Sequence, residues 1–436
     1  MNKTQRLYNR AKNIIPGGTQ LFSKRPELYS PGLWPAYFSK ARGCHVWDMD
    51  GRCYTDMASM GIGSCLLGYA DKDVNAAVGR VVRAGNMSTL NAPEDVELAE
   101  LLISLHPWAQ QVRLARTGGE AMSIAVRLAR AKTRRDTVLF CGYHGWHDWY
   151  LAANVADKKS LDGHLLPGLN PLGVPRSLRG TAIPFAYNDT TGFKKLIKGG
   201  KHKIGAVILE SIRGVLPERS FLNAVQEETR AIGAVLVVDE ITAGFRLTIG
   251  GAHRLFDLRP DIAVFAKGMS NGYPMSAIIG VRDVMQAAQD SFVSSTYWTE
   301  RIGPTAAIAT IKKIKRLNIP EKLSRIGKEV QAGWRSIAKQ RGVEIVVSGI
   351  DPLCHFSFKQ GDPLLLKTLF TQFMLEEGFL ATNAFYASYA HEGKYVENYL
   401  VSADKAFYKM GNALRTGTER ALLRGPICSS GFKRLT

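Results

Sequence analysis

A lysine at the end of a short apolar run has the setting of a nucleophilic amine. The run from Ile262 to Ala266 is typical of a buried strand, and Lys267 follows it directly, before glycines at 268 and 272. Burial lowers the pKa of an amine, and a neutral amine can form an imine with an aldehyde. Taken alone, the same pattern also fits a lysine whose ammonium group reaches solvent from a strand end.

Two acidic residues end similar apolar runs. Glu210 closes a run that begins at residue 206, and Asp239 closes a run that begins at residue 234. Unbroken apolar strands indicate a sheet that is buried on both faces and therefore parallel. Ligands of such sheets bind at the carboxyl ends of the strands. Each acid alone is more often a loop or salt-bridge residue, but together with Lys267 they indicate a site.

A glycine pair stands where a strand turns into a helix. Gly118 and Gly119 follow a predicted strand that begins at Val112, and they precede a segment with helical spacing. The first turn of a helix presents free backbone N–H groups and the positive end of the helix dipole, which suit a phosphate. A Gly-Gly pair by itself is more often a plain turn.

Aromatic and imidazole rings follow the next strand. Tyr143 and His144 open this run, which continues through His147 to Tyr150 and indicates a lined pocket. We expect no metal there, because the spacing of the two histidines is not that of a helical zinc pair and no third ligand is evident.

The composition is that of a globular protein with an excess of positive charge. Hydrophobic residues make up 45% of the 436 residues, and the formal net charge is +19. Such a charge attracts anions, but the basic residues form no run or aromatic-interleaved stripe that indicates nucleic-acid binding. No apolar run reaches the roughly 18 residues that a membrane helix needs. The scattered cysteines and the polar start predict a cytoplasmic protein with no membrane partner.

The order of predicted elements is that of an α/β protein with a second, smaller lobe. Strands alternate with helices from about residue 70. A hairpin at residues 43–56 precedes this part, and we expect it to pack on the C-terminal region because it has no partner in the α/β region. The predicted domains are an N-terminal segment 1–65 that packs with the small domain, a large domain 66–315 and a C-terminal small domain 316–436.

Six motifs spread over the chain are specific when taken together. They are Pro16-Gly17-Gly18, Thr117-Gly118-Gly119-Glu120-Ala121, Tyr143-His144-Gly145, Glu210, Asp239-Glu240-Ile241-Thr242-Ala243-Gly244-Phe245-Arg246 and Ala266-Lys267-Gly268. Through them nearly the whole chain resembles the class III aminotransferases, fold type I enzymes that use pyridoxal 5'-phosphate (PLP), and most of all the glutamate-1-semialdehyde aminomutase branch. The resemblance implies a large, mostly parallel α/β domain and a small α+β domain built from both chain ends.

The resemblance also implies roles for the residues around the cofactor ring. Lys267 would form the imine with PLP and move the proton of the substrate, and Asp239 would keep the pyridine nitrogen protonated. Tyr143 would stack on the ring, and His144 and Glu210 would belong to the same cofactor site.

The phosphate site implied by the resemblance needs two subunits. Gly118, Gly119 and Glu120 would bind the phosphate through backbone N–H groups. Thr299 would complete the phosphate site of a neighbouring subunit, which implies a homodimer with its sites at the interface.

The implied activity is transamination. An amino donor would convert PLP to pyridoxamine 5'-phosphate, and a carbonyl acceptor would then take up the nitrogen. The alternatives are an intramolecular amino shift, as in glutamate-1-semialdehyde 2,1-aminomutase, and a non-catalytic basic binding protein on the same fold. This chain has Tyr386 where the aminomutase has a glutamate that holds the substrate amine. The candidate cations for an anionic substrate group are Lys24, Arg25 and Arg213.

Overall fold

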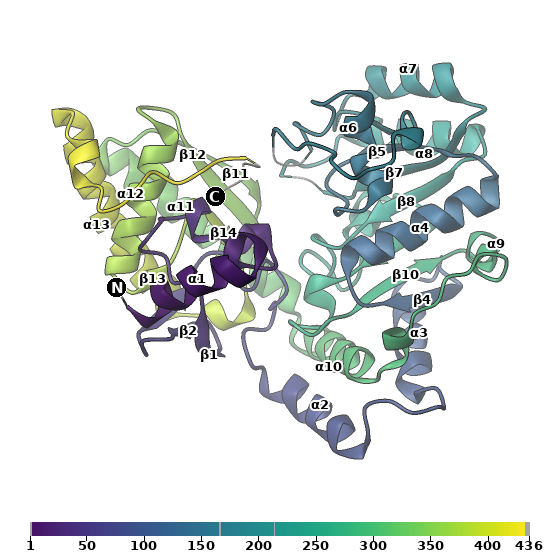
Figure 1. Cartoon of the computed structure of the whole chain (residues 1–436), viewed down its shortest axis with the longest axis horizontal. Coiled ribbons are helices and arrows are strands. Elements are labelled where there is room, and N and C mark those ends of the chain that lie inside the picture. Colours follow the sequence, from purple (N-terminus) through teal and green to yellow (C-terminus); the bar gives the residue numbers. More distant parts are fainter. Residues whose placement is uncertain (1, 165–166, 213, 432–436) are drawn as a thin grey trace. The chain divides into compact units, whose positions relative to one another are not determined.

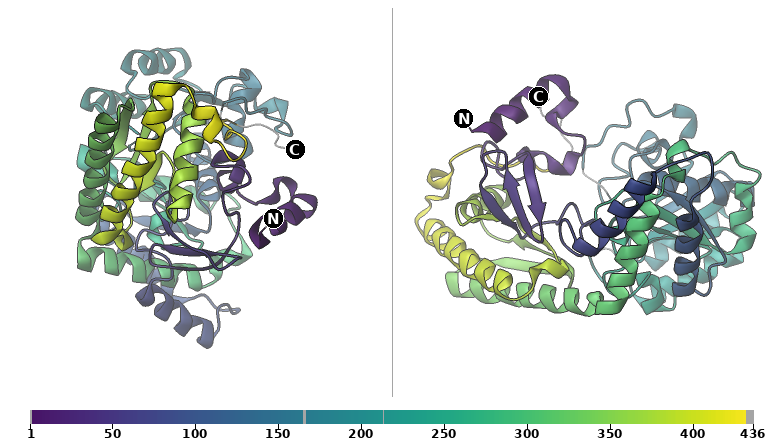
Figure 2. Two further views of the ribbon diagram at one scale, coloured as in Figure 1. Left: turned by 90° about the vertical axis from the view of Figure 1, so that its left-hand side faces the viewer. Right: turned by 90° about the horizontal axis from the view of Figure 1, so that it is seen from below.

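The chain forms two compact units. A computed structural model describes residues 2–164, 167–212 and 214–431. One unit comprises Lys72–Pro320, and the other joins Met1–Asp71 to Glu321–Thr436, so that both chain ends belong to it (Figure 2). The expectation that the chain ends share one small unit is confirmed. The finer domain limits, after residues 65 and 315, stay a prediction.

A seven-stranded sheet is the centre of the unit Lys72–Pro320 (Figure 1). The strand order is β4-β10-β9-β8-β7-β5-β6; β10 is antiparallel to both of its neighbours, and the pairs from β9 to β6 are parallel. The mostly parallel sheet confirms the predicted fold class. The strands are β4 (Gln111–Ala115), β5 (Thr137–Cys141), β6 (Ala182–Pro184), β7 (Ile204–Glu210), β8 (Val235–Asp239), β9 (Ile262–Phe265) and β10 (Ser276–Gly280).

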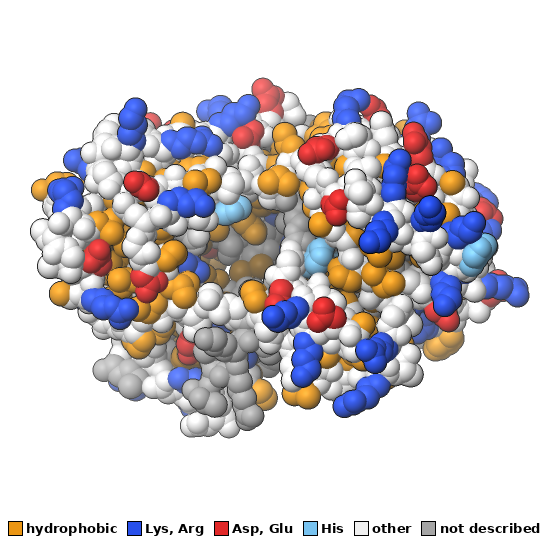
Figure 3. All heavy atoms as spheres, turned by 90° about the horizontal axis from the view of Figure 1, so that it is seen from above, with side chains coloured by type: hydrophobic (Ala, Val, Ile, Leu, Met, Phe, Trp, Pro, Cys, Tyr) orange, Lys and Arg blue, Asp and Glu red, His pale blue; other side chains and the backbone are white. Residues whose placement is uncertain are grey.

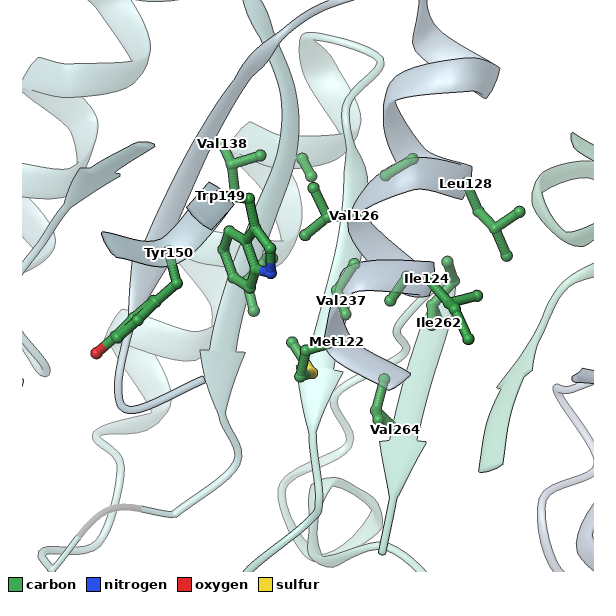
Figure 4. Packing of buried hydrophobic residues seen from close by; sticks show 14 of the residues in the cluster. Met122, Ile124, Val126, Leu128, Val138, Trp149, Tyr150, Val237, Ile262 and Val264 are labelled. Carbon is green, nitrogen blue, oxygen red and sulfur yellow. The ribbon is translucent and has the colours of Figure 1, made fainter. Parts of the chain in front are cut away.

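Alternate residues of the central strands face opposite layers of helices. Val237 and Val264 lie on the face that α4 (Gly118–Thr133) covers, in the same buried cluster as Trp149 (Figure 4). On the other face, Leu236 and its alternate neighbours pack with side chains of α7 (Thr190–Gly200) and α8 (Arg219–Ala231). The strands are apolar along their whole length because both faces are covered.

Three further helices of this unit pack on one another. Helix α10 packs against both α2 and α3. The helices of the unit, apart from α4, are α2 (Lys72–Ala84), α3 (Pro93–Leu105), α5 (Asp148–Leu151), α6 (Ala153–Ala156), α7 (Thr190–Gly200), α8 (Arg219–Ala231), α9 (Arg282–Met285) and α10 (Ile302–Leu317).

The other unit contains two small sheets, one of which joins distant parts of the chain. The predicted hairpin is β2–β3, and β3 pairs in parallel with β13 from the C-terminal region, so its predicted packing is confirmed. The sheets are β1 (Phe38–Arg42), β2 (His45–Asp48), β3 (Cys53–Asp56) with β13 (Phe379–Leu380), and β11 (Ile345–Ile350), β12 (Leu353–Phe358) with β14 (Ala384–Tyr386). Its helices are α1 (Lys3–Ile14), α11 (Ile319–Arg341), α12 (Pro363–Glu376) and α13 (Lys394–Thr416).

Basic side chains are spread over the face of the molecule that Figure 3 shows. On the face shown in Figure 3, lysine and arginine side chains alternate with acidic and apolar ones. Within the described ranges, no helix combines the length and the apolar character needed to cross a membrane.

Candidate active site

Three neighbouring parallel strands bring Glu210, Asp239 and Lys267 to one edge of the sheet. Glu210 at the end of β7 pairs with Asp239 at the end of β8. Asp239 pairs in turn with Val264 on β9, three residues before Lys267. The carboxyl ends of parallel strands are where sheets of this kind bind ligands. The structure therefore brings together the three residues that the sequence pattern suggested as a site.

Lys267 has the environment of an amine that gives up its proton easily. It lies just past β9 with φ 46°, in the left-handed region that residues other than glycine rarely adopt. Its Nζ donates a hydrogen bond to Thr242 Oγ1 over 2.9 Å. Burial lowers the pKa of Lys267, and the Arg246 guanidinium lowers it further, whereas Asp239 and Glu210 act in the opposite direction. A lowered amine pKa favours the nucleophilic, neutral form.

Asp239 is buried, and both of its carboxylate oxygens are engaged. Oδ1 accepts a hydrogen bond from the backbone N–H of Ile241 over 2.9 Å, and Oδ2 accepts one from His144 Nδ1 over 2.7 Å. The His144 ring is also buried, and its Nε2 lies 3.3 Å from Cys141 O. These contacts fix the direction in which the Asp239 carboxylate points.

Tyr143 and Glu210 are joined through the backbone. The Tyr143 N–H donates to Glu210 Oε2 over 3.2 Å. Gly142 makes room for this carboxylate, because a Cβ there would lie 2.5 Å from Glu210 Oε2. Burial raises the pKa of the Tyr143 hydroxyl, and the negative charges of Asp239 and Glu210 add to that effect. Tyr143 therefore belongs to the same strand-end cluster.

The first turn of α4 begins with two glycines, so no side chain covers its backbone there. Thr117 Oγ1 accepts from the Glu120 N–H over 3.4 Å, and Glu120 Oε2 accepts from the Thr117 N–H over 3.2 Å. This capping box uses the Glu120 N–H, whereas the Gly118 and Gly119 N–H groups belong to the first turn, where helices offer no acceptor. A Cβ at Gly118 would lie 2.9 Å from Ile241 Cδ1. Ile241 thus packs directly against Gly118, where a larger residue would not fit.

Thr299 lies in a segment that is anchored beside this helix. Its side chain is exposed, and its Oγ1 donates to Thr296 O over 2.8 Å. The flanking Trp298 donates from Nε1 to Glu120 Oε1 over 2.9 Å, and Arg116 forms an ion pair with Glu300 over 2.8 Å.

Three of the predicted substrate-binding residues, Lys24, Arg25 and Tyr386, belong to the unit formed by the chain ends. The fourth, Arg213, lies outside the described residues. Lys24 is exposed. The Arg25 guanidinium packs 5.0 Å above the Phe22 ring, and its buried Nε has no hydrogen-bond partner within the described chain. Tyr386 is the last residue of β14. The roles of these residues stay predictions.

Two residues of the Asp239–Arg246 motif were assigned no role from the sequence. Arg246 is 1% exposed, and its Nε donates to Thr242 O over 2.8 Å. Thr242 therefore contacts Arg246 through its carbonyl and Lys267 through its hydroxyl. Their position in the turn that follows Asp239 was the available signal, but sequence alone does not show which way the side chains point.

Comparison with known proteins identifies relatives of the whole chain. Residues 30–383 match the family model described as aminotransferase class-III. A 3-aminobutyryl-CoA aminotransferase of Cloacimonas acidaminovorans (strain Evry) is 29% identical, with 89% of this chain and 91% of the relative covered. A 2'-deamino-2'-hydroxyneamine transaminase of Streptomyces kanamyceticus is 33% identical, with 79% and 83% covered. A glutamate-1-semialdehyde 2,1-aminomutase of Polynucleobacter necessarius subsp. necessarius (strain STIR1) is 28% identical, with 94% and 99% covered.

A solved structure extends the similarity to three dimensions. The PLP internal aldimine form of the FumI protein of Sphingopyxis sp. MTA144 superposes with a TM-score of 0.86 at 26% identity. The superposition covers 96% of this chain and 99% of that one.

Proposed function

Because this chain belongs to the class-III aminotransferases, we propose that it uses Lys267 to hold PLP while an amino group passes from a donor to a carbonyl acceptor. The chain is a PLP-dependent aminotransferase, so the alternative of a non-catalytic binding protein is set aside. The observation that carries the residue assignment is the partly buried Lys267 amine, with its lowered pKa and its hydrogen bond to Thr242, near the strand-end carboxylate of Asp239.

The described residues fit this cofactor at three points. The first turn of α4 offers the backbone N–H groups of Gly118 and Gly119, and these glycines put no side chain between that backbone and a ligand, which suits a phosphate. The Asp239 carboxylate can accept a hydrogen bond from a protonated ring nitrogen, because each of its oxygens can accept a second hydrogen bond beside its present one. The lowered pKa of Lys267 suits an amine that must attack a carbonyl.

Each residue then has a physical task. Bound PLP supplies an electron sink for negative charge at the reacting carbon. Asp239 would hold a proton at the pyridine nitrogen, and His144 would keep the carboxylate aimed at it. Lys267 Nζ would carry the proton between the two carbons that exchange it, oriented by Thr242 Oγ1. Tyr143 would cover the ring, and Glu210 would hold the Tyr143 backbone in place.

The proposed substrate carries an anionic group away from the reacting carbon, bound by Arg25. The relatives are named for unlike molecules, 3-aminobutyryl-CoA and 2'-deamino-2'-hydroxyneamine among them, so substrate recognition is argued from this chain's own residues. The buried Arg25 Nε without a partner supports an anion as its counterpart, because an unpaired buried donor is costly. Lys24 and Arg213 would add to the attraction through charge alone.

Arg25→Ala is expected to lower kcat/KM for anionic acceptors by about 10-fold to 100-fold, the effect of losing a hydrogen bond between charged groups. Neutral acceptors should be affected far less. The measurement starts from the amine form, made with an amino donor, and follows the return of the visible absorbance band with each acceptor across ionic strength. Lys24→Ala is the matched control, because Lys24 is exposed and its loss should matter little at high salt. An equal loss for neutral and anionic acceptors would contradict the assignment.

The second candidate function is the intramolecular amino shift. It is favoured by the aminomutase relative, which matches 94% of this chain. Tyr386 argues against it, because a neutral hydroxyl cannot replace the ion pair that a glutamate makes with a substrate amine. Glutamate-1-semialdehyde belongs in the same panel, and its efficient isomerisation without an added acceptor would establish the aminomutase instead.

The protein is further proposed to be a cytoplasmic homodimer in which Thr299 serves the partner subunit's site. The exposed side chains of Phe292 and Tyr297, which are 89% and 72% exposed in the single chain, support an interface around this segment. The anchoring of Trp298 and Glu300 near the same chain's α4 makes a role within one subunit the competing possibility.

Mixing two inactive variants, Lys267→Ala and Thr299→Ala, should restore activity if Thr299 acts across the interface. Random pairing gives about half mixed dimers, each with one complete site, so about a quarter of wild-type activity is expected. The measurement is turnover after the subunits are unfolded together and refolded, with each variant refolded alone as the control. If Thr299 serves its own subunit, both sites of a mixed dimer are damaged and no activity returns. An active monomer in sedimentation would also contradict the dimer.

A further inference from the structure

His147 is a histidine in the site region whose ring nitrogens are unused. It precedes α5, its ring is half-buried, and the ring lies 4.5 Å from that of Trp146. Within the described chain, no hydrogen bond reaches either of its ring nitrogens. By contrast, both nitrogens of His144, three residues earlier, have protein partners. The ring nitrogens of His147 are therefore available to a ligand.

The His147 ring lies against the first turn of α4. A Cβ on Gly119 would lie 3.2 Å from His147 Cδ2 and 3.3 Å from Nε2. The loop that carries the ring is equally close, since a Cβ on Gly145 would lie 2.9 Å from Gly119 Cα. The imidazole therefore occupies the space into which a side chain at position 119 would extend, and its Nε2 edge faces the helix start.

The electrostatic setting of this ring favours an anion. The helix start carries the first-turn N–H groups of Gly118 and Gly119 and the positive end of the helix dipole. The nearby Glu120 carboxylate accepts hydrogen bonds from the backbone N–H groups of Arg116 and Thr117 and from Trp298 Nε1. Burial lowers the pKa of His147, against the opposite effect of Glu120 and Asp148. Whether neutral or charged, the ring can present an N–H at Nε2.

We propose that His147 donates from Nε2 to the phosphate of PLP and supplies the side-chain contact that glycine at position 119 cannot make. This inference rests on the proposed function, in which the phosphate lies on the first turn of α4. His147 is a binding residue in this view and takes no part in moving protons at the reacting carbon.

The test compares PLP with pyridoxal, which lacks the phosphate. Apoenzyme of the full chain is titrated with each, and the dissociation constants are read from the absorbance of the lysine-bound cofactor. His147→Ala should weaken PLP binding by about 10-fold to 100-fold, the effect of a lost hydrogen bond to a charged group. The affinity for pyridoxal should stay unchanged.

Two matched variants separate the hydrogen bond from the shape of the ring. His147→Phe keeps a ring over Gly119 without a donor and should weaken PLP binding as alanine does. His147→Gln keeps an N–H donor of similar reach and should retain most of the wild-type affinity. Thermal unfolding of each apoenzyme shows whether the fold is intact.

The effect of a serine at position 119 on PLP affinity should change sign when His147 is removed. In the wild type, Gly119→Ser should weaken PLP binding, because its Cβ would press on the imidazole. In His147→Ala the same serine has room, and its hydroxyl should recover part of the lost affinity. Additive losses in the double variant would count against the proposal.

The outcomes separate this inference from the proposed function. A wild type that shows no preference for PLP over pyridoxal overturns the phosphate site itself, and His147 with it. A wild type that prefers PLP, combined with a His147→Ala variant that binds both ligands as the wild type does, overturns only the role of His147. An equal loss for both ligands also overturns it, because the ring would then support the loop rather than the phosphate.

Discussion

Replacing Lys267 by alanine is expected to abolish transamination while leaving the fold intact. The variant loses both the amine that holds PLP and the group that moves the substrate proton. General acid–base catalysis alone contributes about 100-fold to 10,000-fold in rate, so a loss of at least that size is expected. The lowered pKa of Lys267 and its hydrogen bond to Thr242 are the structural reasons for choosing this lysine.

The assignment is checked by covalent labelling. Borohydride reduction of the wild-type holoenzyme, followed by peptide mapping, should leave the cofactor on the peptide that contains Lys267. Lys367→Ala is the matched control, because burial also lowers the pKa of Lys367, which lies within helix α12 and not at the end of a sheet strand. That variant should label and turn over normally. A cofactor found on any other lysine would show that the assignment is wrong.

Asp239→Asn should keep the fold and bind PLP but lose about 100-fold to 1,000-fold in the rate of the first half-reaction, the size typical of one preorganised electrostatic contact. The amide has nearly the same shape, so Oδ1 can still accept from the Ile241 N–H. It has no negative charge with which to hold a proton on the pyridine nitrogen, so the ring becomes a poorer electron sink. Stopped-flow absorbance after mixing with an amino donor measures this rate directly.

Asp261→Asn makes the same chemical change at the opposite end of the neighbouring strand. Asp261 precedes β9, is partly buried, and accepts from the Leu236 N–H over 2.8 Å. Its substitution should alter stability more than the half-reaction rate. Near-normal turnover of Asp239→Asn, or an equal kinetic loss in Asp261→Asn, would show that Asp239 is not the partner of the ring nitrogen.

Local sequence patterns were sufficient to predict the sheet and the edge of it that carries the candidate site residues. The runs that end at Glu210, Asp239 and Lys267 are apolar without alternation, because the strands β7, β8 and β9 are covered by helices on both faces. In a parallel sheet such runs must end on the same side, so the sequence alone places the three ionisable residues on one edge. The glycine pair at 118–119 likewise predicted the turn that must join a strand to the helix that follows it.

The directions of the side chains could be learned only from the tertiary structure. His144 and His147 look alike in sequence, and their short spacing even raises a metal site as an interpretation. In the fold one ring turns to Asp239, 95 residues away, and the other lies over Gly119. The sequence places Thr242 in the turn after β8 but does not show that its hydroxyl contacts Lys267 at the end of β9. Hydrophobic periodicity reports which face of a strand or helix is buried, whereas such contacts between polar side chains depend on packing between elements that are distant in sequence.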